Sequence, residues 1–406
     1  IIDPNLQQCV FPSKALAGVG VAFYLLLALR SELRGQGWFE GSGAAEPNMA
    51  QWFDLVALGT VADIARLDYN NRVLVAHGLQ RIRSGRAQAG IQALLEVGGR
   101  DADRVVAADL GFAVGPRLNA AGRLEDMSVG IECLLTDSPV RAAELAAQLD
   151  DLNRRRREIE GEMKRQALAL LGQTSLDDQV GRFAATLYHP DWHQGVIGIL
   201  ASRIKNRLHR PVVVFAQGEQ GLLKGSARSI DAIHIRDQLV QMNTDHPRLL
   251  KSFGGHAMAA GLTISETDLQ RFTELLDRQV ETELAGMPVG EQYLSDGELA
   301  AEEFSVELVQ QLGDAGPWGA GFDEPCFDGQ FELVERRTVG DGHLKMKLRW
   351  PGHSRPVNAI AFGQADEVSA RVGDLIQLLY RPQINEWQGR VSAEFLVERI
   401  FAPVSP

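Results

Sequence analysis

One string in the sequence combines residues that could handle a phosphate ester. It runs from Ser252 to Gly261, and it places two residues without side chains, Gly254 and Gly255, directly before the imidazole of His256. Glycines let a backbone approach a ligand closely, and a histidine can donate a hydrogen bond to a phosphate oxygen. The string predicts a phosphate-binding turn, although a tight turn whose histidine bonds a nearby carbonyl would use the same residues.

A second string, Ser226-Ala227-Arg228, places a hydroxyl and a guanidinium two residues apart. A hydroxyl and a forked, permanently charged guanidinium can together bind one phosphate group. A surface arginine beside a turn serine is the competing interpretation, because a three-residue pattern is weakly specific.

A carboxylate at the end of a long apolar stretch is a candidate metal ligand. Residues 48–62 contain no proline, and the length of this run favours a helix over a strand. Asp63 follows the run directly, and carboxylate oxygens suit Mg²⁺ and Mn²⁺. A local hydrogen bond at a helix end is the ordinary alternative for Asp63. Asp54, at the start of the run, is better placed to interact with the helix dipole.

Two arginines flank an asparagine in a glycine-bounded segment. Arg117 and Arg123 lie on either side of Asn119, between Gly115 and Gly122, and we interpret the segment as a turn. There the arginines could contact backbone phosphates or pair with carboxylates, and the sequence leaves both interpretations open.

Two histidines have the spacing of a helical metal pair. His189 and His193 lie four residues apart, but Pro190 and Gly195 disfavour a helix at this point. We therefore predict a loop near substrate, with His193 as a contact, and no zinc. Trp192 between the histidines could stack on a base.

Taken together, these strings resemble one superfamily of phosphoesterases. Ser252 to Gly261 is similar to the GGHxxAAG signature of the DHHA1 domain, and residues 54–63 are similar to the fourth motif of the RecJ branch of the DHH superfamily. Further strings match that branch in chain order, at residues 11–14, 16–22, 115–123, 189–198 and 225–228. The DxD string, the second-motif aspartate and the Asp-His-His that names the superfamily are absent. We expect them upstream of Ile1, in a chain truncated at its N-terminus.

The resemblance implies a 5′→3′ exonuclease that hydrolyses single-stranded DNA to nucleoside 5′-monophosphates with two Mn²⁺ or Mg²⁺ ions. Asp63 would be catalytic as a metal ligand, and His256 would be catalytic by holding the scissile phosphate. Ser226 and Arg228 would bind the 5′-terminal phosphate. The substrate-binding set is completed by Gly254, Gly255, Arg117, Asn119, Arg123 and His193.

The resemblance also implies partners. Single-stranded DNA is the first, followed by a single-strand-binding protein and a RecQ-type helicase, and the protein would be a monomer. Two alternatives stay open, namely an oligonucleotide or cyclic-dinucleotide phosphodiesterase of the same superfamily and a non-catalytic nucleic-acid-binding scaffold. The first needs neither a long connector nor a barrel, both of which we expect here, and the retained Asp63 and His256 disfavour the second.

Length and composition agree with a multidomain globular protein. The 406 residues argue for two or three domains, and 45% are hydrophobic. The net charge of -12 confines any nucleic-acid site to a local basic region, and residues 200–260 hold nine Lys/Arg against four Asp/Glu. Three scattered cysteines without a CxxC pair indicate a reducing, cytoplasmic setting. The apolar run Ala15 to Leu29 is shorter than the ~20 residues of a membrane span, so we predict a buried helix capped by Ser13 and no membrane segment.

The pattern of elements predicts an α/β fold in four parts. Residues 1–138 would be the C-terminal part of a parallel-sheet DHH domain, 139–172 a connecting helix, 173–290 an α/β DHHA1 domain, and 291–406 an OB-like nucleic-acid-binding barrel built from five short strands. Within the connecting helix, Arg154 to Arg157 are followed by Glu158, Glu160 and Glu162, which predicts a solvated helix face.

Overall fold

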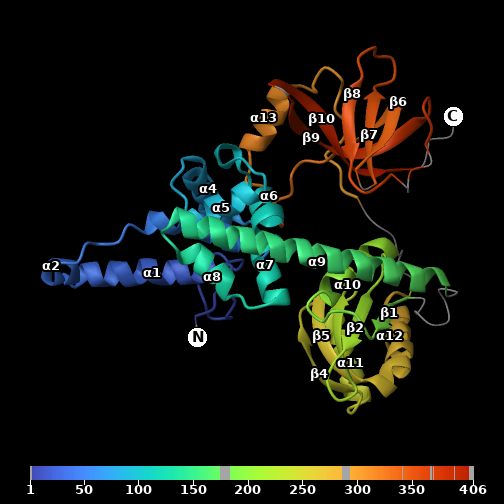
Figure 1. Cartoon of the computed structure of the whole chain (residues 1–406), viewed down its shortest axis with the longest axis horizontal. Coiled ribbons are helices and arrows are strands. Elements are labelled where there is room, and N and C mark those ends of the chain that lie inside the picture. Colours follow the sequence, from blue (N-terminus) through green and yellow to red (C-terminus); the bar gives the residue numbers. More distant parts are fainter. Residues whose placement is uncertain are drawn as a thin grey trace. The chain divides into compact units, whose positions relative to one another are not determined.

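The computed structural model describes residues 2–173, 183–285, 293–340, 342–365, 368, 370–387 and 389–401. The chain forms two compact units, one made of residues 1–115 and 293–406 and the other of residues 116–292. The first unit combines a helical segment with a β-barrel. The second consists of a mixed sheet and the helices that pack on it (Figure 1).

The helical segment of the first unit contains short and medium helices. They are α1 (Gly18–Gly35), α2 (Trp38–Ser42), α3 (Phe53–Ala62), α4 (Tyr69–Arg83), α5 (Ala89–Val97) and α6 (Ala107–Asp109), the last followed by a π-helical turn at Leu110–Val114. The run 48–62 is helical, as predicted: a 3₁₀ turn (Met49–Trp52) leads into α3. The helices α3 and α4 pack closely, since a Cβ built on Gly78 would lie 2.3 Å from the Cβ of Ala57.

The first helix differs from its prediction. It begins at Gly18, and Ala17 occupies the N-cap position without a side-chain cap. Ser13, predicted to cap it, instead donates its hydroxyl to Oδ2 of Asp68 at 2.6 Å. Asp68 in turn caps α4 by accepting the N–H of Asn71 at 2.9 Å. The serine therefore ties this segment to the start of another helix.

The helix α1 is also less buried than predicted. Its buried residues are Gly20 and Phe23, whereas Leu25, Leu26 and Leu29 are 49%, 44% and 50% exposed. In the described part of the chain, no helix is long and apolar enough to cross a membrane.

The second unit contains a five-stranded sheet, counted over the described residues, with the order β1-β2-β3-β5-β4. The strands β1 and β2 are parallel and the other neighbours antiparallel. The elements are α7 (Gly115–Leu124), α8 (Ser128–Leu135), α9 (Pro139–Gln173), β1 (Ala185–His189), α10 (Ile197–Leu208), β2 (Val212–Gln217), β3 (Leu222–Arg228), α11 (Ile235–Asp245), β4 (Leu250–Gly255), β5 (Ala259–Ser265) and α12 (Leu269–Glu283). The long helical signal after Pro139 is confirmed as the single helix α9.

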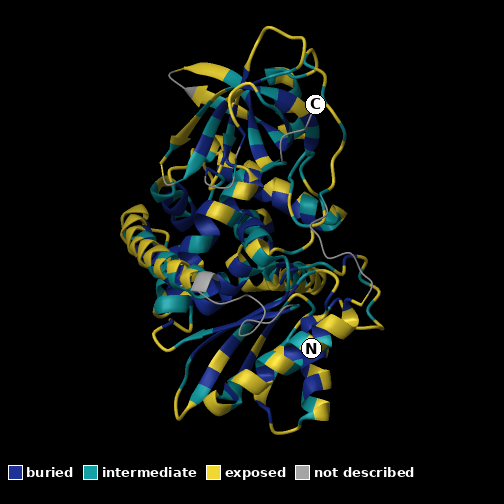
Figure 2. Ribbon diagram, turned by 90° about the vertical axis from the view of Figure 1, so that its right-hand side faces the viewer, coloured by how far each residue is buried: buried dark blue, intermediate teal, exposed yellow. Residues whose placement is uncertain are grey.

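The sheet is covered on both faces, because side chains alternate along each strand. Val212 and Val214 on β2 pack into a core with α9 and α10. Val213 and Phe215 pack on the other face with α11 and α12. The strand β2 is therefore buried on both sides, and the dark blue stretches of the strands in Figure 2 mark this core.

The arginine run on α9 is paired differently from the prediction. Arg154 lies close to Asp150 and forms an ion pair with Asp151, and Arg155 bonds Glu125 at 3.1 Å. Arg156 pairs with Glu160 at 2.8 Å, and its side chain is only 12% exposed, so the prediction of a solvated face is wrong there. Spacings of three or four residues, toward either end of the helix, account for the partners of Arg154 and Arg156, whereas the partner of Arg155 comes from outside α9.

The barrel of the first unit confirms the five predicted strands. It is closed in the order β10-β8-β7-β6-β9 and preceded by a helix, within the residues that the structure describes. Its elements are α13 (Val306–Asp314), β6 (Phe327–Val339), β7 (His343–Arg349), β8 (Val357–Ala361), β9 (Leu375–Trp387) and β10 (Arg390–Ile400). Phe331, Tyr380 and Phe395 fill the interior, and the rings of Tyr380 and Phe395 stack at 3.9 Å. A parallel pairing of β8 with β10 completes the closure.

Candidate active site

The Gly254-Gly255-His256 string lies where β4 ends and the hairpin to β5 begins. The sequence predicts that both glycines are part of the turn. They are instead still on the strand, paired with Gly261 and Ala260, and the turn follows them. His256 is exposed at the start of this turn, and its N–H donates to the carbonyl of Ala259 at 2.8 Å. The hairpin therefore holds the imidazole in the open.

Gly254 and Gly255 have different roles. Gly255 has a φ of +149°, and a Cβ there would lie 2.3 Å from the carbonyl oxygen of Ala259, so the hairpin itself requires glycine. At Gly254 a built Cβ meets nothing within 4 Å. The backbone beside Gly254 is thus open to a ligand, and a shallow cavity of about 460 Å³ lies along this face, lined in part by Gly254, Gly261 and Lys224.

Ser226 and Arg228 lie on β3, one strand away from this string. The register aligns Ser226 with Gly261 and Arg228 with Ala259, and Gly261 is aligned on its other side with Gly254. The sheet thus brings both predicted phosphate-binding strings together. Arg228 donates Nη1 to the Ser226 hydroxyl at 3.0 Å and to the Ala227 carbonyl at 2.8 Å.

The first turn of α10 covers these two side chains. A Cβ built on Gly198 would lie 2.9 Å from Nη2 of Arg228 and 3.1 Å from Oγ of Ser226. The N-terminal end of a helix carries a partial positive charge, and its first N–H groups lack partners within the helix. Gly198 lies in the string 189–198 that resembles the family, and its role was not predicted; a glycine at the second position of a helix is the signal that could have indicated it.

A second guanidinium acts electrostatically on Arg228. Arg123 donates Nη1 to the carbonyl of Gly195 at 3.1 Å. Burial lowers the pKa of Arg228, and the positive charge of Arg123 lowers it further. Within the described ranges neither guanidinium forms an ion pair with a carboxylate. Two partly desolvated cations with no counter-charge make a site that favours an anion.

The segment around Asn119 is the helix α7 and not a turn. Its Pro116 stands in the first turn, where the missing N–H costs no helical hydrogen bond. Arg117 is buried and pairs with Asp150 of α9, with Nη2–Oδ1 at 2.7 Å, so of the two interpretations left open the carboxylate pair is present. Asn119 is exposed, and it lies four residues from Arg123, on the same side of the helix.

His193 lies in a loop between β1 and α10, as predicted. It is exposed, and its Nδ1 accepts the N–H of Gly195 at 3.1 Å. His189 stacks on Trp192 at 5.8 Å, and Trp192 is 3% exposed with its indole N–H bonded to Gln166. The idea that Trp192 stacks on a base is wrong, because the ring is inside the core.

Asp63 belongs to the other unit. It is the C-cap residue of α3, its N–H donates to the carbonyl of Gly59 at 3.1 Å, and it is exposed. Asp54 at the start of α3 is fully buried instead. Its Oδ2 accepts the N–H of Gln88, the N-cap residue of α5, at 2.7 Å, and Arg81 approaches at 3.6 Å. Asp54 is therefore a structural carboxylate.

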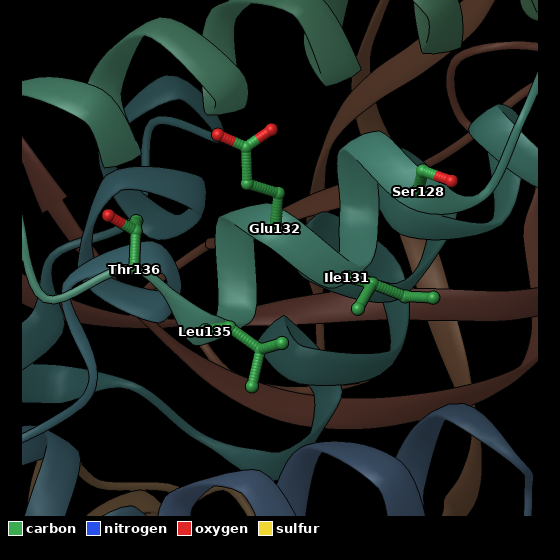
Figure 3. A pocket seen from close by; sticks show the side chains of 5 residues that line it. All are labelled: Ser128, Ile131, Glu132, Leu135 and Thr136. Atoms are coloured by element: carbon green, nitrogen blue, oxygen red, sulfur yellow. The ribbon is translucent and has the colours of Figure 1, made fainter.

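The donor chemistry of Asp63 fits a divalent cation, since an exposed carboxylate offers oxygens of the kind that Mg²⁺ and Mn²⁺ prefer. Over the described ranges, no group of three or more His, Cys, Asp or Glu side chains gathers to hold a metal ion. Asp63 is thus a candidate ligand without a metal-binding cluster around it in the described residues. A shallow pocket on α8, lined by Ser128, Ile131, Glu132, Leu135 and Thr136, includes none of the predicted site residues (Figure 3).

Two family models match this chain. Residues 181–282 match the DHHA1 domain and residues 295–399 match the RecJ OB domain. The first covers the sheet with Ser226, Arg228 and His256, and the second covers the barrel.

Whole-chain relatives agree with these matches. The single-stranded-DNA-specific exonuclease RecJ of Dickeya dadantii is 50% identical over 99% of this chain and 70% of its own length. The crystal structure of RecJ from Thermus thermophilus in complex with Mg²⁺ has a TM-score of 0.76 at 30% identity, over 99% of this chain and 58% of that one. The complex of the same protein with Mn²⁺ has a TM-score of 0.75 at 31% identity, over 97% and 54%. The chain thus spans less than two thirds of these solved structures.

Proposed function

This chain belongs to the RecJ family of exonucleases, and on that premise we propose that the protein degrades single-stranded DNA from the 5′ end to nucleoside 5′-monophosphates. The observation that carries the proposal is the pair of guanidiniums, Arg123 and Arg228, that lack a carboxylate in the described structure: Arg228 bonds the Ser226 hydroxyl, and the charge of Arg123 acts on Arg228. Arg228 lies on β3, in the sheet that also presents His256, and Arg123 lies on α7.

The 5′-terminal phosphate binds to Ser226 and Arg228 in this proposal. The guanidinium offers charge-assisted hydrogen bonds, and the hydroxyl offers a further donor. The partial positive charge at the N-terminal end of α10 favours the bound anion. Arg123 adds a second positive charge, and Asn119 and His193 contact the strand nearby. A terminal phosphate has one more negative charge than an internal phosphodiester, so a strongly cationic pocket selects an end and sets the direction of digestion.

His256 holds the scissile phosphate. Its exposed imidazole donates to a non-bridging oxygen, the open backbone at Gly254 lets the phosphate come close, and Gly255 forms the hairpin that holds the imidazole. Donors aimed at oxygens on which charge grows stabilise the transition state more than the ground state. Arg117 acts indirectly, because its pairing with Asp150 fixes α7 on α9 and so fixes the helix that carries Asn119 and Arg123.

In this proposal Asp63 contributes a carboxylate to two divalent cations, and the DxD string, the second-motif aspartate and the Asp-His-His that the resemblance implies would supply the other ligands. Bound Mn²⁺ or Mg²⁺ would activate water and neutralise charge on the phosphate. The role of Asp63 itself is to present its oxygens from a fixed position at the end of α3.

The other assignments follow the same premise. The barrel binds the strand beyond the cut, and the parts 1–138, 139–172, 173–290 and 291–406 act as the end of the DHH domain, connector, DHHA1 domain and OB domain. We further propose a cytoplasmic monomer that works with a single-strand-binding protein and a RecQ-type helicase. A pull-down with each purified partner and sedimentation of the protein alone test this set.

The direct test is His256→Ala in the complete product of the gene. Removing a donor from the scissile phosphate lowers kcat on a 5′-phosphorylated single strand by about 10²–10³-fold. His246→Ala, which removes another imidazole of the same unit, is the matched control and leaves kcat within about twofold. Equal turnover by the wild type and His256→Ala would remove His256 from the catalytic machinery.

A further inference from the structure

The turn that follows Asp63 is strained. Ile64 has a φ of +54°, a conformation that β-branched residues avoid, and it is 77% exposed. Two backbone bonds hold the turn from the side of α3: Ile64 N–H to the Val61 carbonyl at 3.0 Å and Ala65 N–H to the Thr60 carbonyl at 3.1 Å. A strained residue persists only where its surroundings hold it.

A loop that leads into the barrel holds the other side of this turn. We define the docking loop as residues 316–322. The Leu67 N–H donates to the carbonyl of Ala320 at 2.7 Å, and a Cβ on Gly319 would lie 2.7 Å from Cδ1 of Leu67, which is 3% exposed. The contact is close enough that the loop needs a residue without a side chain at this point.

Gly321, two residues after Gly319, packs in the same way on Arg66, the residue before Leu67. Its φ is +70°, and a built Cβ would lie 2.6 Å from Cγ of Arg66. Arg66 and Leu67, three and four residues after Asp63, are therefore both packed on the docking loop. The backbone between them and Asp63 has little freedom left.

Aromatic stacking connects the loop to helices on both sides. Trp318 stacks on Phe322 with centroids 4.8 Å apart, and the guanidinium of Arg72 on α4 lies 4.0 Å from the centre of the Phe322 ring. The indole N–H of Trp318 donates to the Leu312 carbonyl of α13 at 2.9 Å. A continuous set of contacts thus runs from α13, beside the barrel, to the start of α4.

We propose that the docking loop is a positioning element for the Asp63 carboxylate. It fixes Arg66 and Leu67, which keeps Ile64 in its strained conformation and so keeps Asp63 at its place after α3. Loss of the loop's contacts lets Ile64 relax and moves the carboxylate. The inference rests on the proposed role of Asp63 as a metal ligand and adds that the barrel side of the molecule determines where that ligand stands.

A matched pair of glycine substitutions tests the mechanical part in the complete product of the gene. Gly321 and Gly363 both have a φ of +70°, but a Cβ at Gly363 meets nothing within 4 Å. Gly321→Ala and Gly363→Ala therefore place alanine at the same left-handed φ, and only the first disturbs Arg66. Hydrogen exchange of the Leu67 and Ala65 amides should be roughly tenfold faster in Gly321→Ala than in Gly363→Ala, as for the loss of one buried hydrogen bond. Equal exchange in the two variants overturns the proposal.

Binding of Mn²⁺ alone tests the functional part, with Asp63→Asn as the reference. We expect Asp63→Asn to weaken Mn²⁺ binding most, Gly321→Ala to weaken it about three- to tenfold, and Gly363→Ala to leave it unchanged. If Asp63→Asn has no effect, the proposed role of Asp63 fails and this inference fails with it. If Asp63→Asn weakens binding and Gly321→Ala does not, the docking loop alone is refuted.

The conservative variants Phe322→Tyr and Phe322→Leu separate positioning from general stability. Tyrosine keeps an aromatic face for Arg72 and Trp318, so Phe322→Tyr should retain the Mn²⁺ affinity of the wild type. Phe322→Leu should lose part of it. If Mn²⁺ affinity falls in both variants, and falls in proportion to their loss of thermal stability, the loop is an ordinary structural contact and the proposal is overturned.

Discussion

The unit of residues 116–292 contains two kinds of arginine. Arg117 and Arg156 each meet a carboxylate of α9, Asp150 and Glu160. Arg123 and Arg228 bond only backbone carbonyls and a hydroxyl in the described structure, and the charge of one lowers the pKa of the other. An arginine that has its counter-charge belongs to the scaffold. An arginine that lacks one marks the place where an anion is favoured.

The largest effect should come from breaking a scaffold pair. Arg117→Ala removes the close, buried partner of the Asp150 carboxylate and leaves only the 3.7 Å approach of the exposed Arg154, which should lower the free energy of unfolding by about 3 kcal/mol. Urea unfolding measures this. The double variant Arg117→Met with Asp150→Leu should recover most of the loss, because no unpaired charge is left. Failure to recover would mean that the pair does more than hold α7 on α9.

The anion-site arginine should behave in the opposite way. Arg228→Ala should lower kcat/KM on a 5′-phosphorylated single strand roughly thirtyfold, as expected for charged hydrogen bonds of about 2 kcal/mol. On a 5′-hydroxyl strand the same variant should change kcat/KM less than threefold. A loss of equal size on both substrates would contradict the assignment of Arg228 to the terminal phosphate.

Substitution of Arg123, the other arginine without a carboxylate, should change stability and phosphate affinity in opposite directions. Arg123→Gln removes a charge that repels Arg228, so the unliganded protein should gain about 0.5 kcal/mol of stability, while the affinity for the 5′-phosphate should fall about fivefold. Thermal melting and competition by inorganic phosphate measure the two quantities. A variant that loses both stability and affinity would place Arg123 with the scaffold arginines.

The smallest effect is expected at Arg154. Its side chain is 63% exposed and its partners Asp150 and Asp151 are on its own helix. Arg154→Ala should change the free energy of unfolding by less than about 0.5 kcal/mol and leave nuclease activity unaltered. A larger change in activity would show that α9 carries part of the DNA contact.

The elements with strong local patterns were predictable from the sequence. The helix α9 follows from its apolar spacing, and the barrel strands follow from short β-branched runs. Likewise, Pro190 and Gly195 identified the loop that carries His193. In each case the local signal and the tertiary structure favour the same conformation.

Other features depend on contacts that the sequence does not display. The strand β3 contains Gly225 and Ser226, and β4 ends in two glycines, so neither has the composition of a strand; pairing with β5 makes them strands. Gly115 and Pro116 suggested a turn, yet they begin the helix α7, because proline is tolerated in a first turn. Which arginines lack a carboxylate was equally hidden, since the partner of Arg117, Asp150, is decided by the packing of α7 against α9.

The tight fit of Gly198 under Ser226 and Arg228 restricts how this protein can change over evolutionary time. A methyl group at position 198 would reach to within 2.9 Å of the guanidinium. Drift at this position is therefore tied to drift at position 228: a descendant that acquires alanine or serine at 198 should carry a shorter residue at 228. The pair should vary together or not at all.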